Sequence, residues 1–294
     1  MSLIVAPEVA DALHRGAAVV ALETSIVAQG LPVPRNLEAA FACEDAIRAA
    51  GAVPATTAIL DGALRVGLSR AEIEVLGTSG TAIKVSARDL GWGVARRISG
   101  ATTVAATVRL AALAGIRFMA TGGIGGIHLG APFDVSADLE EIARRPVAVF
   151  CAGPKLVLDI PLTLERLETL SVPVVGYGSD DVPAFYLRTS GRRADVRVDD
   201  PAAAVRLLRA TWDSGGLGVV VGVPPPRELP LARDLVQQAT ADQGDVHGAA
   251  LTPRLLGRIA ELSGGQSVEV NVELVVNNAR VAAACAAAWG RSNA

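Results

Sequence analysis

The stretch TGGIGGIHLGAPFDVSADLEEIARRPVAVFCAGPK, residues 121–155, contains the elements that decide the fold of this chain. A glycine-rich turn follows Thr121, and Ser136 then stands before a segment that predicts a helix over 137–145. Serine can cap a helix start, and acidic residues in the first turn complement its positive end. The apolar run 146–153 predicts a buried strand that ends just before Lys155. Turn, helix and strand in this order are typical of an α/β fold.

The same alternation extends through the rest of the chain. Apolar runs bounded by turn residues predict strands over 16–23, 53–60, 116–121, 146–153, 172–178 and 217–223. Helical periodicity and capping residues predict helices over 36–50, 69–77, 102–115, 137–145, 161–170, 202–214, 228–243, 252–262 and 269–289. Residues 24–34 and the polar segment 179–200 are expected to be loops. We therefore expect an α/β fold with a mostly parallel or mixed sheet, helices on both faces, and a single domain over 1–294.

Composition excludes several classes of function. The formal net charge of -3 gives no basic surface for nucleic acid or for an anionic membrane, and aromatic residues are only 3% of the chain. The three cysteines, Cys43, Cys151 and Cys285, are far apart and form no zinc or redox motif, which favours reduced thiols. No signal peptide and no apolar run of spanning length is visible. The sequence thus predicts a cytoplasmic protein that binds neither nucleic acid nor membrane.

Lysine is scarce in this chain. Among 27 Lys and Arg residues, only Lys84 and Lys155 are lysines. Arginine cannot lose its proton in a protein, whereas a buried lysine can become a neutral amine nucleophile. The alternative for Lys155 is a stem packed on the sheet edge with its head in water, and a bias toward Arg codons would also leave few lysines.

In an open parallel sheet, ligands bind outside the carboxyl ends of the strands. This rule brings together four segments: the strand end at Glu23, the turn 121–126, residues 153–155, and residues 176–178. Glu23 ends an apolar strand, so it is either a candidate acid or a solvated carboxylate. The glycines of the turn either allow close backbone packing or present amides to an anion.

Two further groups of polar residues are candidates for binding. Asp134 and Asp138 flank Ser136, and carboxylates near a phosphate would suit Mg²⁺ or Mn²⁺ with several waters, although helix capping explains Ser136 and Asp138 equally well. Lys84 and the helix start at 102–103 would suit a phosphate group, although a surface lysine and an ordinary cap have the same pattern. His128 either orients a ligand or is merely hydrogen-bonded. The pair Asn277 and Asn278 lies inside the last helix against its propensity, which indicates a polar role or a helix end.

Several blocks together resemble the pseudouridine-5'-phosphate glycosidase family, also called the indigoidine synthase A family. These blocks are VVALETSIVAQGLPVPRN, RVGLSRAEIEVLGTSGTAIKVSARDL, ATTVAAT, TGGIGGIHLGAPFDVSADL, CAGPKLVLDIPLTLERLET, VPVVGYGSDDVPAFYLRTSG and LVVNNARVA. They follow the family order over nearly the whole chain. The resemblance implies a nucleoside-hydrolase-like α/β fold, a homotrimer, and reversible cleavage of pseudouridine 5'-phosphate to uracil and ribose 5-phosphate.

The resemblance also implies roles for individual residues. Lys155 would be the covalent nucleophile that forms a Schiff base with ring-opened ribose, and Glu23 the proton donor. Asp134 would hold Mn²⁺ or another divalent cation such as Mg²⁺. The residues implied to contact substrate are Lys84, Val104, Thr121, His128, Ser136, Ala137, Asp138 and Asn278.

The sequence departs from the family pattern at a few positions. Thr24-Ser25 stands where the family reads Ser-Thr, Gln29 where His is common, and Ala87 where Arg is common. The loop after His128 is two residues shorter than usual. Two other functions remain open, a lysine-dependent lyase acting on another sugar phosphate and a catalytically silent sugar-phosphate-binding protein.

Overall fold

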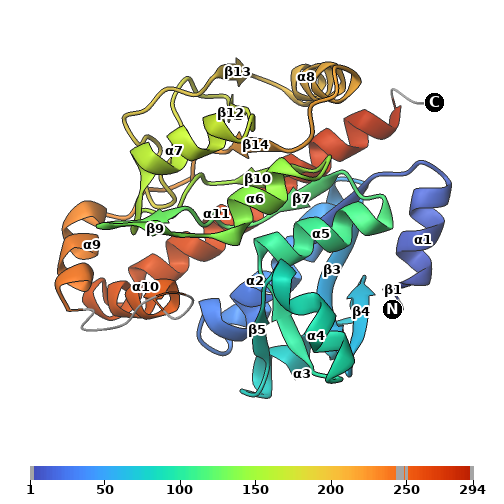
Figure 1. The fold of residues 1–294 in the computed structure, drawn as a ribbon, viewed down its shortest axis with the longest axis horizontal. Coiled ribbons are helices and arrows are strands. Elements are labelled where there is room, and N and C mark those ends of the chain that lie inside the picture. Colours follow the sequence, from blue (N-terminus) through green and yellow to red (C-terminus); the bar gives the residue numbers. More distant parts are fainter. Residues whose placement is uncertain (1–2, 243–247, 249–250, 292–294) are drawn as a thin grey trace.

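Eleven strands of the described residues form one twisted sheet in this computed structural model, which describes residues 3–242, 248 and 251–291. Its central strands are hydrogen-bonded in the order β1-β4-β3-β2-β7-β10-β14-β12-β13, and β6 and β5 branch from β3. A second, three-stranded antiparallel sheet has the order β11-β8-β9. Figure 1 shows the sheet running through the middle of the molecule with helices in front of it and behind it.

The strands have the following bounds: β1 Leu3–Val5, β2 Val19–Leu22, β3 Val53–Leu60, β4 Ala63–Val66, β5 Ile83–Val85, β6 Gly100–Thr102, β7 Phe118–Ala120, β8 Ile127–His128, β9 Ala131–Val135, β10 Ala148–Cys151, β11 Leu158–Asp159, β12 Val174–Tyr177, β13 Val196–Val198 and β14 Val219–Gly222. The α-helices are α1 Pro7–His14, α2 Arg35–Ala49, α3 Arg70–Thr78, α4 Leu90–Ala95, α5 Val104–Ala114, α6 Ala137–Ala143, α7 Ile160–Thr169, α8 Pro201–Asp213, α9 Ala232–Ala241, α10 Leu251–Leu262 and α11 Gln266–Arg291. A π-helix, η1, spans Ile26–Gly30, and a 3₁₀ turn, η2, spans Ala87–Asp89.

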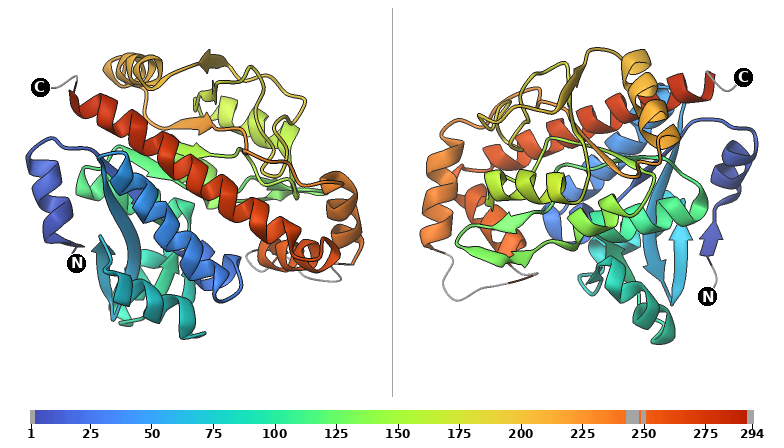
Figure 2. Two further views of the ribbon diagram at one scale, coloured as in Figure 1. Left: turned by 180° about the vertical axis from the view of Figure 1, so that it is seen from behind. Right: turned by 45° about the horizontal axis from the view of Figure 1, so that its top comes forward.

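The central strands are buried on both faces because their side chains alternate between two apolar cores. In β2, Val20 and Leu22 join the core beneath α2 and α11, while Val19 and Ala21 join the opposite core beneath α5. Figure 2 shows α2 and α11 lying side by side on the first face. The pairs among β2, β7, β10, β14, β12 and β13 are all parallel, whereas β3 pairs antiparallel with β4 and β6. The predicted α/β class with a mostly parallel or mixed sheet is therefore confirmed.

Local signals at helix ends were read correctly in several places. Ser69 and Glu72 form the expected capping box, and Thr103 caps α5, which ends at Gly115 in the left-handed conformation. Ser136 caps α6 by accepting a hydrogen bond from the amide of Asp138 at 3.2 Å.

Other boundaries were predicted wrongly, each for a tertiary reason. Gly77 lies inside α3, where a Cβ would come within 2.8 Å of Leu37, so close packing requires the glycine. Asn36 does not cap α2 but lies buried within it, and its amide donates to the carbonyl of Val27 at 2.7 Å. The expected loop 24–34 contains η1. Helix α9 begins at Ala232, after Leu231 in the left-handed conformation.

The segment 179–200 is also not the plain polar loop that was expected. It contains β13 and buries an apolar group at its centre, Val182, Ala184, Phe185 and Tyr186. In the described part of the chain, no helix is long and apolar enough to cross a membrane. The single domain expected over 1–294 and the cytoplasmic location stay predictions.

Candidate active site

A cavity of about 350 Å³ opens beyond the carboxyl ends of β2 and β10. Nine of the residues singled out from the sequence line it: Glu23, Lys84, Val104, His128, Asp134, Ser136, Ala137, Asp138 and Lys155. A smaller lobe adjoins it and shares Glu23, Lys84 and Lys155 with the main cavity. Segment 176–178 does not line either lobe, because β14 lies between its strand, β12, and β10. The rule that gathered four segments was therefore right for three of them.

Lys155 reaches the cavity from a sharp turn after β10. Gly153 has φ of +81°, and a Cβ there would lie 1.9 Å from the carbonyl oxygen of Pro183, so only glycine fits. The amide of Lys155 donates to the carbonyl of Ile124 at 3.2 Å, and its own carbonyl accepts from the amide of Leu158 at 3.0 Å. The backbone of Lys155 is thus held on both sides, which fixes where its half-buried side chain enters the cavity.

Glu23 extends β2 into the cavity and has both carboxylate oxygens bound. The hydroxyl of Thr121 donates to Oε1, and the hydroxyl of Ser25 donates to Oε2. Thr121 is only 1% exposed and lines neither lobe of the cavity. Its contact with the site is the hydrogen bond to Glu23. The acid is therefore oriented by two hydroxyls that come from different segments of the chain.

The glycine-rich turn forms the floor between these two groups. The amides of Ile124 and Gly125 are already bound, to the carbonyl of Gly153 at 3.1 Å and to Oδ2 of Asp138 at 2.8 Å. A Cβ at Gly125 would lie 2.3 Å from Oγ of Ser136, which shows how closely the segments pack. Close backbone packing therefore accounts for Ile124 and Gly125, whose amides have internal partners, whereas an anion contact by the other amides of the turn stays a prediction.

Asn278 supports the floor from below. It is fully buried in α11, and its amide donates to the carbonyls of Thr121 at 2.8 Å and Gly122 at 3.2 Å. The neighbouring Asn277 instead accepts a hydrogen bond from Arg280 at 2.7 Å. Asn278 is therefore the asparagine that faces the site, but it lies behind the lining residues, and direct contact with substrate stays a prediction.

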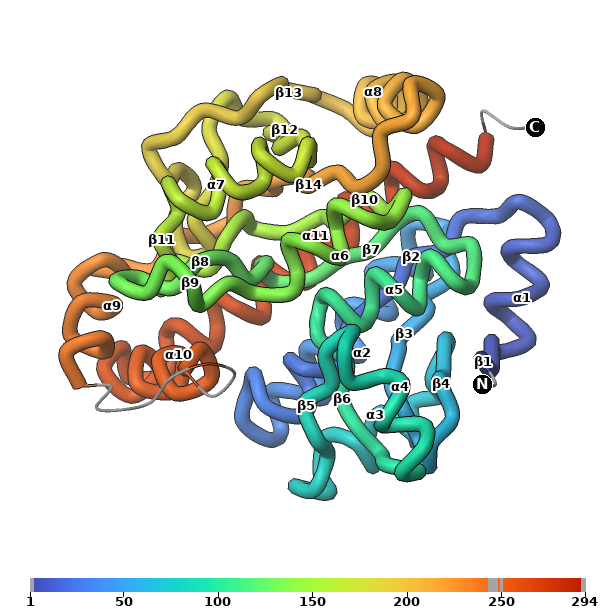
Figure 3. The backbone as a smooth tube through the Cα atoms, viewed as in Figure 1, coloured from blue at the N-terminus to red at the C-terminus, as the bar shows by residue number. Residues whose placement is uncertain are grey.

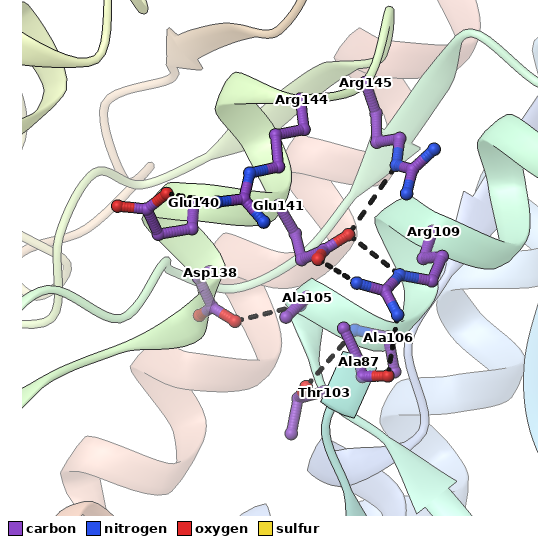
Figure 4. Close-up of polar contacts among 10 residues, drawn as sticks. All are labelled: Ala87, Thr103, Ala105, Ala106, Arg109, Asp138, Glu140, Glu141, Arg144 and Arg145. Carbon is purple, nitrogen blue, oxygen red and sulfur yellow. Dashed lines mark hydrogen bonds and ion pairs between the residues drawn. The ribbon is translucent and has the colours of Figure 1, made fainter. Parts of the chain in front are cut away.

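Asp138 joins the two helices whose starts face the cavity. Its Oδ1 accepts from the amide of Ala105 in the first turn of α5 at 2.9 Å (Figure 4). Its Oδ2 accepts from the amide of Gly125 in the floor at 2.8 Å. A part-buried bidentate pair between Arg109 and Glu141 joins the same helices further along (Figure 4). Asp138 is only 6% exposed, and both of its carboxylate oxygens accept hydrogen bonds from backbone amides. Asp138 therefore lines the cavity and also holds its walls together.

Lys84 lines both lobes of the cavity together with Glu23 and Lys155. It pairs with Ala101 in the β5–β6 ladder, which places it beside the start of α5. Burial lowers the pKa of Lys84, and the nearby charge of Lys155 lowers it further, while Asp138 and Glu23 oppose this shift. The positive end of α5 together with the Lys84 ammonium makes this part of the cavity attractive to a phosphate group.

His128 and Asp134 face each other on the β8–β9 hairpin. His128 Nδ1 lies 3.2 Å from Asp134 Oδ2, and its Nε2 lies 3.4 Å from the hydroxyl of Thr252 in α10. The hairpin and α10 are neighbours in Figure 3 as well. Across the described residues, no three His, Cys, Asp or Glu side chains are placed to share a metal ion. A partly exposed single carboxylate fits only a cation that keeps most of its waters, as Mg²⁺ does.

The sequence did not reveal several lining residues. Ser25 and Arg88 lie close to predicted ones and could have been suspected from position, whereas Phe185, Thr252 and Asn271 come from distant segments. Phe185 has φ of +57°, and a Cβ on Gly123 would lie 2.5 Å from its ring. No local signal predicts such a contact, because it depends on how the 179–200 segment folds over the floor.

Comparison with known proteins identifies the family. The family described as "Indigoidine synthase A like protein" matches residues 8–288. A pseudouridine-5'-phosphate glycosidase of Nocardioides sp. is 52% identical over 97% of this chain and 95% of its own length. The enzyme of the same name from Myxococcus xanthus is 49% identical, with all of both chains covered.

Solved structures agree with this assignment. The prealnumycin C-glycosynthase in complex with ribulose 5-phosphate has a TM-score of 0.89 and 36% identity, covering 99% of this chain and 98% of that one. An indigoidine synthase A-like protein from Thermotoga maritima has a TM-score of 0.89 and 31% identity, covering 94% of each chain. The resemblance seen in the sequence is thus confirmed, and the chain belongs to the indigoidine synthase A-like family.

Proposed function

We propose that this protein is a pseudouridine-5'-phosphate glycosidase, which reversibly cleaves the C–C glycosidic bond to give uracil and ribose 5-phosphate. The observation that carries the proposal is that Lys155 and Glu23 line one cavity together with Lys84 and the start of α5. The names of the relatives support the same activity.

The proposed chemistry uses Lys155 as an amine nucleophile. Its nitrogen forms a bond to C1 of the sugar as the ring C–O bond breaks, and the ring oxygen takes up a proton. After the nitrogen loses a proton, its lone pair forms an iminium with sugar C1 while the bond from C1 to C5 of uracil breaks. The electron pair of that bond takes up a proton on the base. Water hydrolyses the iminium to release ribose 5-phosphate. Among the side chains of this cavity, only a lysine supplies a nitrogen that can do this.

Glu23 is proposed as the group that supplies a proton. A carboxyl group held by Thr121 and Ser25 on the cavity wall can protonate the ring oxygen or the departing carbon of the base. Its two hydroxyl partners restrict its rotation, which favours proton transfer to one position.

The end of the cavity around Lys84 is proposed to hold the phosphate. Lys84, Thr103 and Val104 line it, so a phosphate would meet an ammonium, a hydroxyl and the positive end of α5. Ser136 and Ala137 line the facing side, near the sugar. Binding energy at the phosphate would anchor the sugar for reaction at its other end.

We also propose a metal site and an oligomeric state. Asp134 would hold Mn²⁺ or Mg²⁺ with water as the other ligands, where the ion would neutralise phosphate charge.

The β8–β9 hairpin exposes Leu129, Phe133 and Val135, with Phe133 97% exposed, which suits burial between the subunits of a homotrimer. Light scattering on the purified protein would test the trimer.

A second candidate function is a lysine-dependent lyase that acts on another sugar phosphate. The similar C-glycosynthase was solved with ribulose 5-phosphate, and a lysine plus a phosphate site would serve such a substrate too. Release of uracil from pseudouridine 5'-phosphate separates the two functions. A silent binding protein would release nothing from either substrate.

Borohydride trapping tests the covalent step. The protein is incubated with ribose 5-phosphate, reduced with borohydride and digested, and its peptides are analysed by mass spectrometry. We expect an adduct on the peptide that carries Lys155. No adduct, or an adduct on Lys84, would refute the assignment of the nucleophile.

A further inference from the structure

Four threonine hydroxyls form a buried cluster behind the wall of the cavity. Thr24, Thr57, Thr102 and Thr107 are each 0% exposed and come from four different segments. Thr24 directly follows Glu23, and Thr102 directly precedes Thr103, which lines the phosphate end. None of the four lines either lobe of the cavity, so the proposed mechanism does not use them directly.

Two hydrogen bonds of this cluster have a defined direction. Thr24 and Thr102 both donate their hydroxyl hydrogens to the carbonyl oxygen of Thr57, each at 2.7 Å. The single hydrogen of the Thr57 hydroxyl has two acceptors within reach, the carbonyl of Leu22 at 3.3 Å and Oγ1 of Thr102 at 2.9 Å. The hydroxyl of Thr107 lies 3.0 Å from Oγ1 of Thr57. One carbonyl, that of Thr57, thus accepts hydrogen bonds from two segments, of which one leads to Glu23 and the other to Thr103.

Backbone groups complete the connection between those segments. The amide of Thr102 donates to Oγ1 of Thr24 at 2.9 Å, and the amide of Thr24 donates to the carbonyl of Thr102 at 3.2 Å. Glu23 and Thr103 are therefore joined through a pair of residues that bind each other twice. Side-chain networks of this kind fix geometry when every member is satisfied.

The sheet itself explains why threonines are needed here. Residues 53–56 of β3 pair in parallel with β2, whereas Ala58 and Ile59 pair antiparallel with β6 on the same edge. Thr57 is the residue at which the neighbour of β3 changes, because β2 leaves the sheet toward Glu23. Regular ladder bonds cannot form at this branch point, and an unpaired buried backbone group is costly. The hydroxyls supply the missing partners.

We propose that Thr24, Thr57, Thr102 and Thr107 are positioning residues that set the distance between the proton donor Glu23 and the phosphate anchor at α5. This inference rests on the proposed function. A sugar phosphate anchored at one end reacts only if the acid at the other end is placed correctly, and a displacement of about 1 Å can lower the rate on the order of 100-fold. The cluster acts through Glu23 and touches no substrate.

Substitution of Thr24 tests the inference with uracil release as the assay. Thr24→Val keeps the shape and removes the hydroxyl, so the amide of Thr102 loses its acceptor. We expect kcat to fall about 10- to 100-fold while KM changes less than about threefold. Thr24→Ser restores the hydroxyl and should recover kcat to within about threefold of the wild type.

Thr56→Val is the matched control. Thr56 is the buried neighbour of Thr57 on the same strand, but its hydroxyl donates to Glu44 at 2.6 Å and takes no part in the cluster. It should lower Tm to a degree similar to Thr24→Val and leave kcat unchanged. A similar kcat loss in both valine variants, or an unchanged kcat in Thr24→Val, would overturn the inference.

A folding defect in Thr24→Val and a failure of the proposed function can both be told apart from a failure of the positioning role. If Thr24→Val does not fold, Thr107→Val at the far end of the cluster decides, and an unchanged kcat there overturns the proposal. If the wild type releases no uracil, the proposed function fails and this inference falls with it. Normal wild-type turnover with an unaffected Thr24→Val refutes the positioning role alone.

Discussion

The two lysines of this chain lie in contrasting parts of the sheet. Lys155 follows β10, a central strand with parallel neighbours on both sides, whereas Lys84 is on β5, which pairs only with β6 among the described strands. The amide of Lys155 is hydrogen-bonded to Ile124 in the floor, and its carbonyl is hydrogen-bonded to Leu158 in the turn that follows. A nucleophile must come within bonding distance of its target carbon, whereas a phosphate anchor acts through charge and hydrogen bonds. The protein places each lysine in the matching environment.

Replacing each lysine by arginine tests this comparison most strongly. Lys155→Arg keeps the charge but cannot form an iminium, so we expect turnover to fall more than about 10⁴-fold with an unchanged fold. Lys84→Arg should retain a substantial part of the activity, because arginine also binds phosphate. Uracil release and circular dichroism measure both variants. Appreciable turnover by Lys155→Arg would contradict the covalent role.

Glu23→Gln tests the acid that faces Lys155. The amide keeps the shape of the side chain but cannot deliver a proton, and a lost general acid costs on the order of 10²- to 10⁴-fold in kcat. KM should change little, because the phosphate end is untouched. If kcat is normal and only KM rises, Glu23 binds substrate and is not the proton donor.

Gly153→Ala tests how firmly the turn before Lys155 is held. The added Cβ would lie 1.9 Å from the carbonyl oxygen of Pro183, so we expect the free energy of unfolding to fall by about 3 kcal/mol or more. Gly130→Ala is the control, because Gly130 also has a positive φ but has no atom within 4 Å of the added methyl. It should cost only about 1 kcal/mol. Equal losses in urea unfolding would show that conformational strain, and not the close contact, governs this turn.

Lys84→Met is expected to weaken substrate binding more than it slows turnover. Loss of a charged phosphate contact of about 1.5–3 kcal/mol should raise KM roughly 10- to 100-fold, with kcat less affected. Burial holds the pKa of Lys84 below its ordinary value, so the charged lysine lowers the free energy of unfolding at neutral pH. This loss of stability disappears as the pH rises above the pKa that Lys84 has in the unfolded chain. Lys84→Met should therefore raise Tm at pH 7. A lower Tm with an unchanged KM would mean that Lys84 is a structural cation.

Much of this site could be predicted because its signals are local. Apolar runs locate the central strands, and the carboxyl-end rule then brings Glu23 and Lys155 together. The role of Gly153 and the contact of Phe185 could not be predicted, since both depend on how the 179–200 segment packs. The threonine cluster was also missed. A threonine in a strand is ordinary, and only the change of neighbour at Thr57 shows that its hydroxyl has a special task.

The hydrogen bonds from Asn278 to the floor have a consequence for how the protein is made. They join residues 157 and 156 positions apart in sequence, so the turn beneath Lys155 lacks its support until α11 has been synthesised and has docked. During translation, the lysine and its acid emerge long before that helix. A growing chain therefore carries both reactive groups without their final geometry, and catalytic competence arrives only with one of the last helices to leave the ribosome.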